Sequence, residues 1–365
     1  MRTSGIHWST ATGEAAWVRE RLDDFASDTA ASVVPRGFEA YARLPHPLSA
    51  DDVEGVEGEG SEAEWPDVHW ARVAEWSGMP LERESRFPDI ALPPHTPEGP
   101  RPWDGNGPEE GSLTGPALHA LLEVLRRHTP DPERCWFCVW DGYGWDGAAT
   151  FSFSALDTGD GEGDGGGEGS GRAVVPPQPS DPVPASVRSG PRVSLPHREY
   201  FLWHGDLSAA LAFVDSEGQS PNLWWAGDRS WCVASEIDLT WTYVGGSRAL
   251  IDELLADPRV EALPAGPDDA VQDRVPEWLG PRIAAAVDEL LEHGRTVMEM
   301  SRGTVTARLR RPARLRAGSL RLAWESDAGS SASGGEELRR GSTGEALRRE
   351  LADALGRTLL ELANG

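Results

Sequence analysis

The stretch "PNLWWAGDRSWCVASEIDLTWTYVGGSR", residues 221–248, holds four of the chain's 16 tryptophans. In an extended strand over residues 230–243, alternate side chains point to opposite faces. One face is then almost entirely apolar and carries Trp231 and Trp241, whereas the other has a polar centre. This alternation predicts a strand whose tryptophans pack in a core, so we expect Trp231 and Trp241 to be buried and structural.

The polar face of this predicted strand carries Glu236 and Asp238, two residues apart. The strand rise puts their carboxyl groups roughly 6 to 7 Å apart, a separation used by acid–base carboxylate pairs and by metal sites. A solvated sheet face explains the same pattern without any site. His204, Arg229 and Arg248 are candidates to complete a site, although no spacing ties them to the pair. The candidate catalytic residues are Glu236, Asp238 and His204.

A second candidate site is the strand–turn–helix junction "YVGGSRALIDELL". Ser247 is the expected N-cap, and the free N–H groups of a helix start suit a carboxylate or phosphate. An ordinary tight turn is the alternative, because no phosphate-binding glycine motif is present and the chain has no Lys. Trp224 and Trp225 are adjacent in a strand, so one of them is a candidate aromatic platform. The candidate ligand-binding residues are Trp224, Arg229, Gly245, Gly246, Ser247 and Arg248.

Short helices mixed irregularly with strand-like runs predict an α+β fold with a mixed or antiparallel sheet and flanking helices. The clearest helical pattern is a leucine stripe over residues 343–363, and other helices are expected at 13–27, 114–128, 247–256 and 279–293. Strands are expected in "FEAYARL", "CWFCVW", "TFSFSAL", "EYFLWHG", "TVTARLR" and "SLRLAW".

Low-complexity segments divide the chain. Residues 157–194 are rich in Gly and Pro and predict a disordered insertion. The organisation expected is therefore one α+β domain in two parts, 1–156 and 195–295, followed by a small C-terminal α+β unit at 296–365. Residues 50–64 are expected to form an acidic loop, and residues 327–335 a loose loop.

The charge balance bears on the partners. Sixty acidic residues against 34 basic ones give a net charge of −26, which repels phosphate backbones and anionic lipids. Residues 295–365 hold 13 Arg and nine acidic residues, a local charge of +4, so the preceding residues carry −30. We therefore expect no nucleic acid and no membrane as partner, and a basic protein fits better. No signal peptide, no membrane span and only three cysteines predict a soluble cytoplasmic protein.

Several motifs for defined chemistry are incomplete. "CWFC" has the CxxC spacing but lies inside an apolar strand, and "DGEGDG" lacks the acidic twelfth position of a calcium loop. Neither H-x-x-x-H nor G-x-S-x-G is present. The sequence therefore predicts no metal site and no cofactor.

The blocks "PNLWWAGDRSWCVASEIDLTWTYVGGSRALIDELLADP", "RCWFCVWDGYG" and "HREYFLWHG" resemble a group of uncharacterised proteins from high-GC Gram-positive (actinobacterial) bacteria. The resemblance implies a type of organism and no activity. Two function classes stay open: a non-enzymatic binding protein with an acidic surface that engages a basic partner, and a small-molecule hydrolase or transferase that uses Glu236 and Asp238 beside the Gly245–Ser247 turn.

Overall fold

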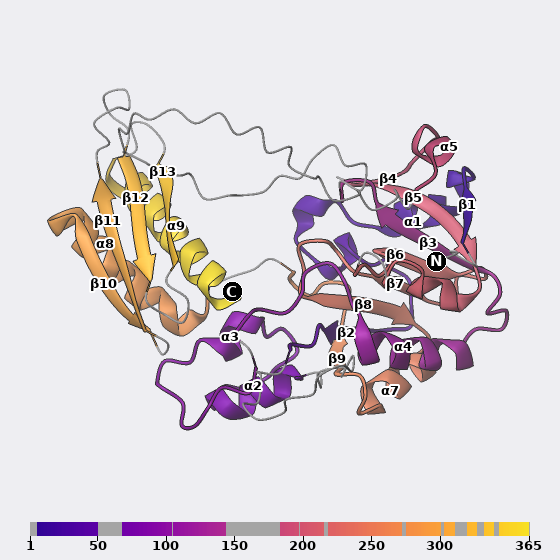
Figure 1. The fold of residues 1–365 in the computed structure, drawn as a ribbon, viewed down its shortest axis with the longest axis horizontal. Helices are drawn as coiled ribbons and strands as arrows, with labels where there is room; N and C mark the ends of the chain where they lie inside the picture. Colours follow the sequence, from indigo (N-terminus) through magenta and orange to yellow (C-terminus); the bar gives the residue numbers. More distant parts are fainter. Residues whose placement is uncertain are drawn as a thin grey trace, which may run out of the picture.

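The protein folds into two antiparallel sheets with helices packed against them, which confirms the α+β class (Figure 1). The computed structural model describes residues 6–49, 68–103, 105–143, 183–196, 198–214, 218–271, 275–300, 303–310, 320–326, 332–338 and 343–364. Within these ranges, no helix is long and apolar enough to cross a membrane. The predicted acidic loop at 50–64 and the expected strand at 150–156 both lie outside the described residues.

The larger sheet has nine strands, in the order β1-β5-β3-β6-β7-β8-β2-β9, and β4 pairs with β5 beside this path. All of its pairings are antiparallel. Its strands are β1 His7–Ser9, β2 Ala40–Pro45, β3 Cys135–Trp140, β4 Val193–Leu195, β5 Arg198–Gly205, β6 Leu223–Ala226, β7 Cys232–Ala234, β8 Trp241–Gly246 and β9 Leu263–Ala265.

The single strand expected over residues 230–243 is wrong, because the chain turns at residues 235–240 and forms the hairpin β7–β8. Cys232 pairs with Gly245 and Ala234 with Tyr243. The turn shifts the alternation, so Trp231 packs in the core on one face of the sheet and Trp241 in the core on the other. Both tryptophans are buried, as predicted.

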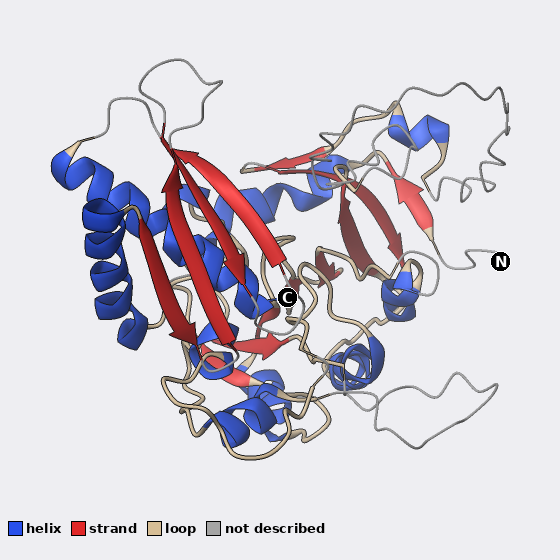
Figure 2. Cartoon of the chain, turned by 60° about the vertical axis from the view of Figure 1, so that its left-hand side comes forward, coloured by secondary structure: helices blue, strands red, loops and turns tan. Residues whose placement is uncertain are grey.

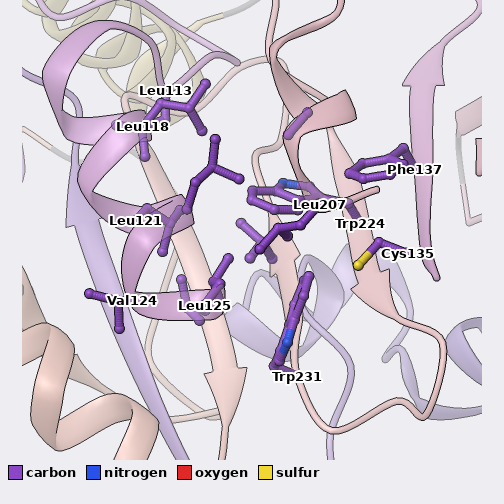
Figure 3. Packing of buried hydrophobic residues seen from close by; sticks show 14 of the residues in the cluster. Leu113, Leu118, Leu121, Val124, Leu125, Cys135, Phe137, Leu207, Trp224 and Trp231 are labelled. Carbon is purple, nitrogen blue, oxygen red and sulfur yellow. The ribbon is translucent and has the colours of Figure 1, made fainter. Parts of the chain in front are cut away.

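Helices α4 (Gly115–Arg127) and α7 (Arg248–Ala256) cover one face of the large sheet. The apolar stripe of α4 meets aromatic side chains of the central strands, and Figure 3 shows Leu118, Leu121 and Leu125 opposite Trp224 and Trp231. Trp231 also donates its indole N–H to Thr129 Oγ1 at 2.8 Å. The indole of Trp231 in this apolar core is therefore hydrogen-bonded, whereas the buried Nε1 of Trp203 in the same core has no acceptor among the described residues.

Shorter helices cover the opposite face: α1 (Ala16–Arg21), α2 (Trp70–Ser77) and α3 (Phe87–Ala91), with several 3-10 turns between them. Glu261 caps α2 by accepting from the backbone N–H groups of Trp70 at 2.6 Å and Ala71 at 2.8 Å. With both faces covered, polar side chains on the central strands β7 and β8 are buried and depend on partners inside the protein.

The smaller sheet is a meander of four strands in the order β10-β11-β12-β13, and Figure 2 shows its long strands side by side. These are β10 Arg295–Met300, β11 Gly303–Arg310, β12 Leu320–Ser326 and β13 Ala332–Leu338. Helices α8 (Gly280–His293) and α9 (Gly344–Asn364) pack against it around one apolar cluster. The predicted leucine stripe supplies Leu351, Leu355 and Leu359 to that cluster.

Two boundaries differ from the sequence predictions in this part of the chain. Helix α8 shares its core with the smaller sheet, whereas the predicted boundary at residue 296 leaves that helix in the preceding unit. Residues 332–335, expected to be part of a loose loop, belong to strand β13. Backbone pairing with β12 overrides the low strand propensity of their Ser and Gly residues.

The predicted insertion at 157–194 extends too far. Residues 157–182 lie outside the described residues, but residues 183–194 contain α5 (Ala185–Arg188) and most of β4. Val183 and Val193 are buried, at 1% and 3% exposure. Arg192 contacts Asp141 at 2.7 Å and donates to the carbonyl groups of α5 and its C-terminal turn. This segment is therefore part of the large sheet and its core.

Two matched deletions test that assignment. Replacing residues 157–182 with a short Gly-Ser bridge is expected to change the melting temperature by only a few degrees, since long surface insertions cost little to close. Replacing 157–194 also removes Val183, Val193 and the Arg192 anchor. Each buried valine contributes about 2 kcal/mol, so we expect a fall of about 10 °C or more by calorimetry. Equal melting temperatures for the two deletions would contradict the assignment.

Candidate functional site

Glu236 and Asp238 lie in the turn between β7 and β8, where a single guanidinium joins them. Arg198, the first residue of β5, donates from Nη2 to Glu236 Oε1 at 2.8 Å and to Asp238 Oδ2 at 2.7 Å. Its Nε reaches the same Glu236 oxygen at 3.0 Å. The Arg198 guanidinium also lies 5.4 Å from the centroid of the Trp140 ring. A positive side chain thus occupies the position between the carboxylates.

The surroundings of this ion pair are partly dry. The Glu236 side chain is 10% exposed and that of Asp238 69%. Burial raises the pKa of Glu236, and the hydrogen bond and charge of Arg198 act in the opposite direction. The ion pair with the guanidinium holds the turn against β5 and places a positive charge between the carboxylates, which disfavours a cation there. Arg198 therefore anchors the β7–β8 turn to strand β5.

The remaining candidates for this site lie far from it. His204 stands six residues beyond Arg198 on β5, roughly 20 Å along the strand. The Gly245–Gly246 pair ends β8, whereas Glu236 and Asp238 precede its start, so roughly 16 Å of strand separates the two features. The structure therefore brings Arg198 to the carboxylate pair and does not bring His204, Arg248 or the glycine turn.

The helix start at Ser247 is filled by the chain itself. Ser247 Oγ accepts from Leu250 N at 3.2 Å, which confirms the predicted N-cap. The N–H of Arg248 donates to Glu39 Oε2 at 2.9 Å, so a carboxylate already lies at the positive end of α7. The two glycines make room for packing, since a Cβ at Gly245 would meet Phe38 at 2.5 Å. The predicted ligand-binding residues at this junction therefore make contacts within the protein, and the carboxylate at the helix start belongs to Glu39.

The expected aromatic platform is also absent from the surface. Trp224 and Trp225 are each 1% exposed, on opposite faces of a sheet that is covered on both sides. The prediction of Trp224 as an aromatic platform is therefore wrong. Each of the two adjacent tryptophans packs in a hydrophobic core, one on each face of the sheet. Arg229 is exposed in the β6–β7 turn, where its φ is 63°, and its guanidinium lies 5.7 Å from the centroid of the Trp17 ring.

A series of buried hydrogen bonds also holds the β7–β8 turn, through Ser235 and Thr242. His46 is 1% exposed; its Nδ1 contacts the carbonyl oxygen of Glu109 at 2.6 Å and its Nε2 contacts Thr242 Oγ1 at 2.9 Å. The carbonyl can only accept, so Nδ1 carries the proton and Nε2 accepts from Thr242. Ser235 Oγ lies 2.6 Å from Thr242 Oγ1 and completes the series. Burial lowers the pKa of His46 to about 4.

One open pocket, named here the acidic pocket, has a volume of about 810 Å³. The α2–α3 connection forms one wall, Asp269 contributes from the turn after β9, and the segment before α8 forms the other wall. Its lining includes five carboxylates and one guanidinium. These residues are Met79, Pro80, Glu82, Arg83, Glu84, Ser85, Asp89, Asp269, Pro276, Glu277 and Trp278.

Two of the five carboxylates are used inside the protein. Asp269 accepts from Arg83 Nε at 2.8 Å and from the N–H of Gly266 at 2.8 Å, and Asp89 accepts from the N–H of Arg86 at 2.7 Å. Glu82, Glu84 and Glu277 make no ion pair within the described part of the chain. The acidic pocket therefore presents unneutralised negative charge to the solvent.

The wall of the acidic pocket is held from behind by two buried arginines. Arg43 Nη2 donates to the carbonyl of Ser85 at 2.5 Å, and Arg86 Nη1 donates to that of Glu84 at 2.6 Å. Both guanidinium groups lie over Trp241, at 5.0 and 5.1 Å from its ring centroid. Burial lowers the pKa of Arg43 to about 10, so the group stays charged at neutral pH. This support fixes the backbone that carries Glu82 and Glu84.

Sequence reasoning did not find the acidic pocket. Its residues come from three separated segments, none with a motif, and the charged run "LERESR" at 81–86 contains as many Arg as Glu, so it does not signal an acidic surface. Arg198 was also missed, although it directly precedes the recognised strand "EYFLWHG". Among the described residues no group of three or more His, Cys, Asp or Glu could hold a metal. The three cysteines are free and buried, and burial raises the pKa of each thiol.

Comparison of the chain with protein-family models, with curated proteins and with solved structures finds no match. The resemblance to actinobacterial proteins stays a prediction, and the function must be argued from the geometry of the chain itself.

The Arg198 anchor is tested by two single substitutions. Glu236→Gln leaves a partly buried guanidinium without the more buried of its two carboxylate partners, so we expect the free energy of unfolding to fall by about 1 to 3 kcal/mol. Asp238→Asn, at the more exposed carboxylate, should cost less than about 1 kcal/mol. Urea unfolding at pH 7 measures both. An unchanged or raised stability in Glu236→Gln would indicate instead a carboxylate held at a cost to folding, as at a functional site.

The buried imidazole of His46 predicts a pH dependence of stability. With a pKa near 6.5 when unfolded and about 4 when folded, the unfolded chain binds one more proton between these values. The contribution of His46 is therefore complete above pH 6.5 and is lost as the pH falls toward 4, at most about 3 kcal/mol. Urea unfolding from pH 7 to 4 should show wild type and His46→Gln converging on acidification. A constant difference between them would contradict the neutral buried imidazole.

Proposed function

We propose that the protein is a non-enzymatic binding module that engages a basic protein partner through the acidic pocket. The observation that carries this proposal is the set of carboxylates, Glu82, Glu84 and Glu277, that line an open pocket without an ion pair in the described residues. Elsewhere Glu39, Glu236 and Glu261 are used to hold the fold together. The contrast separates carboxylates that stabilise the protein from carboxylates that face a potential ligand.

The shape and lining of the acidic pocket suit a cationic side chain. The carboxylates attract a guanidinium or ammonium group, and the half-buried indole of Trp278 supplies an apolar surface beside them. A basic peptide segment supplies such a cation.

The charge of the whole chain supports the same class of partner. A net charge of −26 accelerates the encounter with a basic surface and weakens that with nucleic acid or anionic lipid. The enzyme alternative has less support from the geometry, because the Glu236–Asp238 pair is occupied by Arg198 and lies far from His204 and the Gly245–Ser247 turn.

A peptide-binding measurement tests the proposal. A fluorescent peptide of alternating Arg and Gly serves as the probe, with an equally long peptide of Glu and Gly as its counterpart. Fluorescence anisotropy is expected to show binding of the Arg peptide only, and weaker binding as salt is raised from 20 to 300 mM. Exposed ion pairs contribute about 0.2 to 1 kcal/mol each, so the triple variant Glu82→Gln, Glu84→Gln, Glu277→Gln should lower the affinity about tenfold.

The matched control removes the same charge elsewhere. Glu98→Gln, Glu133→Gln and Glu345→Gln are exposed positions outside the acidic pocket, and this triple variant should change the affinity less than twofold. An equal loss in both triple variants would show that net charge alone attracts the peptide. Absence of binding in wild type at 20 mM salt would remove the basis of the proposal.

A further inference from the structure

Two histidines that are far apart in the sequence face each other at an edge of the large sheet. His7 on β1 is the register partner of His204 on β5. Their imidazole rings are stacked, with centroids 5.2 Å apart and planes 23° from parallel. Both side chains are exposed. Cross-strand partners project from the same face, so the two rings share one patch of surface.

The position of this pair is fixed by packing on the opposite side of β1. Trp8 points to the other face, where its ring lies 5.6 Å from that of Trp203 and 5.9 Å from that of Phe213. Alternation then turns His7 outward beside His204. Trp136, the partner of His204 on β3, places its ring 5.1 Å from the His204 ring and limits the open side of the pair to the direction of His7.

These imidazoles differ from the other histidines whose contacts are known. His46, His119 and His128 each use at least one ring nitrogen in a hydrogen bond to the protein. His7 and His204 form no hydrogen bond within the described ranges, so their nitrogens are available to an outside ligand. Partial burial and the neighbouring His7 lower the pKa of His204, which favours the neutral ring that binds metals.

We propose that His7 and His204 together bind one divalent ion of the late transition series, such as Ni²⁺, Cu²⁺ or Zn²⁺, and that the ion ties β1 to β5. Two imidazole nitrogens on one ion at about 2.1 Å lie about 3.4 Å from each other in tetrahedral geometry. Exposed side chains reach that arrangement by small changes of χ1 and χ2. Water completes the coordination, since the described residues supply no third ligand.

A pair of ligands on neighbouring strands gains over a single histidine through its high effective concentration. We therefore expect a single Ni²⁺ site in the untagged protein by titration calorimetry at pH 7.5. Either His7→Asn or His204→Asn should weaken it at least tenfold. The matched control is His119→Asn, an exposed histidine with no imidazole partner, which should bind as wild type does. Retention of the wild-type affinity in either single variant would overturn the proposal.

A second measurement needs no substitution. The paramagnetic spectrum of wild-type protein with one equivalent of Cu²⁺ should show two imidazole nitrogens bound to the ion, and one or none would overturn the proposal. Because an ion that binds only the folded protein stabilises it, Ni²⁺ should also raise the melting temperature of wild type. Neither single variant should show that rise. Circular dichroism without metal checks that each variant is folded.

Discussion

Because helices cover both faces of the nine-stranded sheet, the polar groups around its central strands are shielded from water and depend on partners inside the protein. The contacts around strand β8 show the effect. Thr242 and Ser235 are joined to the neutral imidazole of His46, and Arg43 and Arg86 lie over Trp241 while donating to backbone carbonyls. The same constraint moves Glu236 and Asp238 out of the strand and into the turn, where Arg198 neutralises them.

Periodicity predicted the elements with a strong local pattern. Helices α4, α7, α8 and α9 and strands β2, β3 and β5 all lie where alternation or an apolar stripe placed them, to within a few residues. The hairpin β7–β8 was missed because the segment "ASEIDLT" contains neither Gly nor Pro, and tertiary contacts form its turn. Gly111 donates its N–H to Leu239, and the turn lies so close that a Cβ at Gly111 would meet Ile237 at 2.8 Å.

The sites were less predictable than the elements, and the reason is physical. A carboxylate pair on one strand can be recognised from spacing, but its ion-pair partner depends on which strand comes to lie alongside. Strand β5 brings Arg198 to Glu236 from 38 residues away. The acidic pocket and the His7–His204 pair likewise arise from segments that only the fold brings together. A site whose residues come from different segments therefore cannot be predicted from local sequence patterns.

The strand order also determines when each part of the chain can fold during synthesis. Strand β1 needs β5, and β2 needs β8, partners that the ribosome makes roughly 200 residues later. The N-terminal strands therefore cannot complete their pairing until most of the chain has been synthesised. The meander β10 to β13 pairs each strand with the next one, so its backbone pairing needs no distant partner. Its core is complete only when α9, which supplies Leu351, Leu355 and Leu359, has also been made.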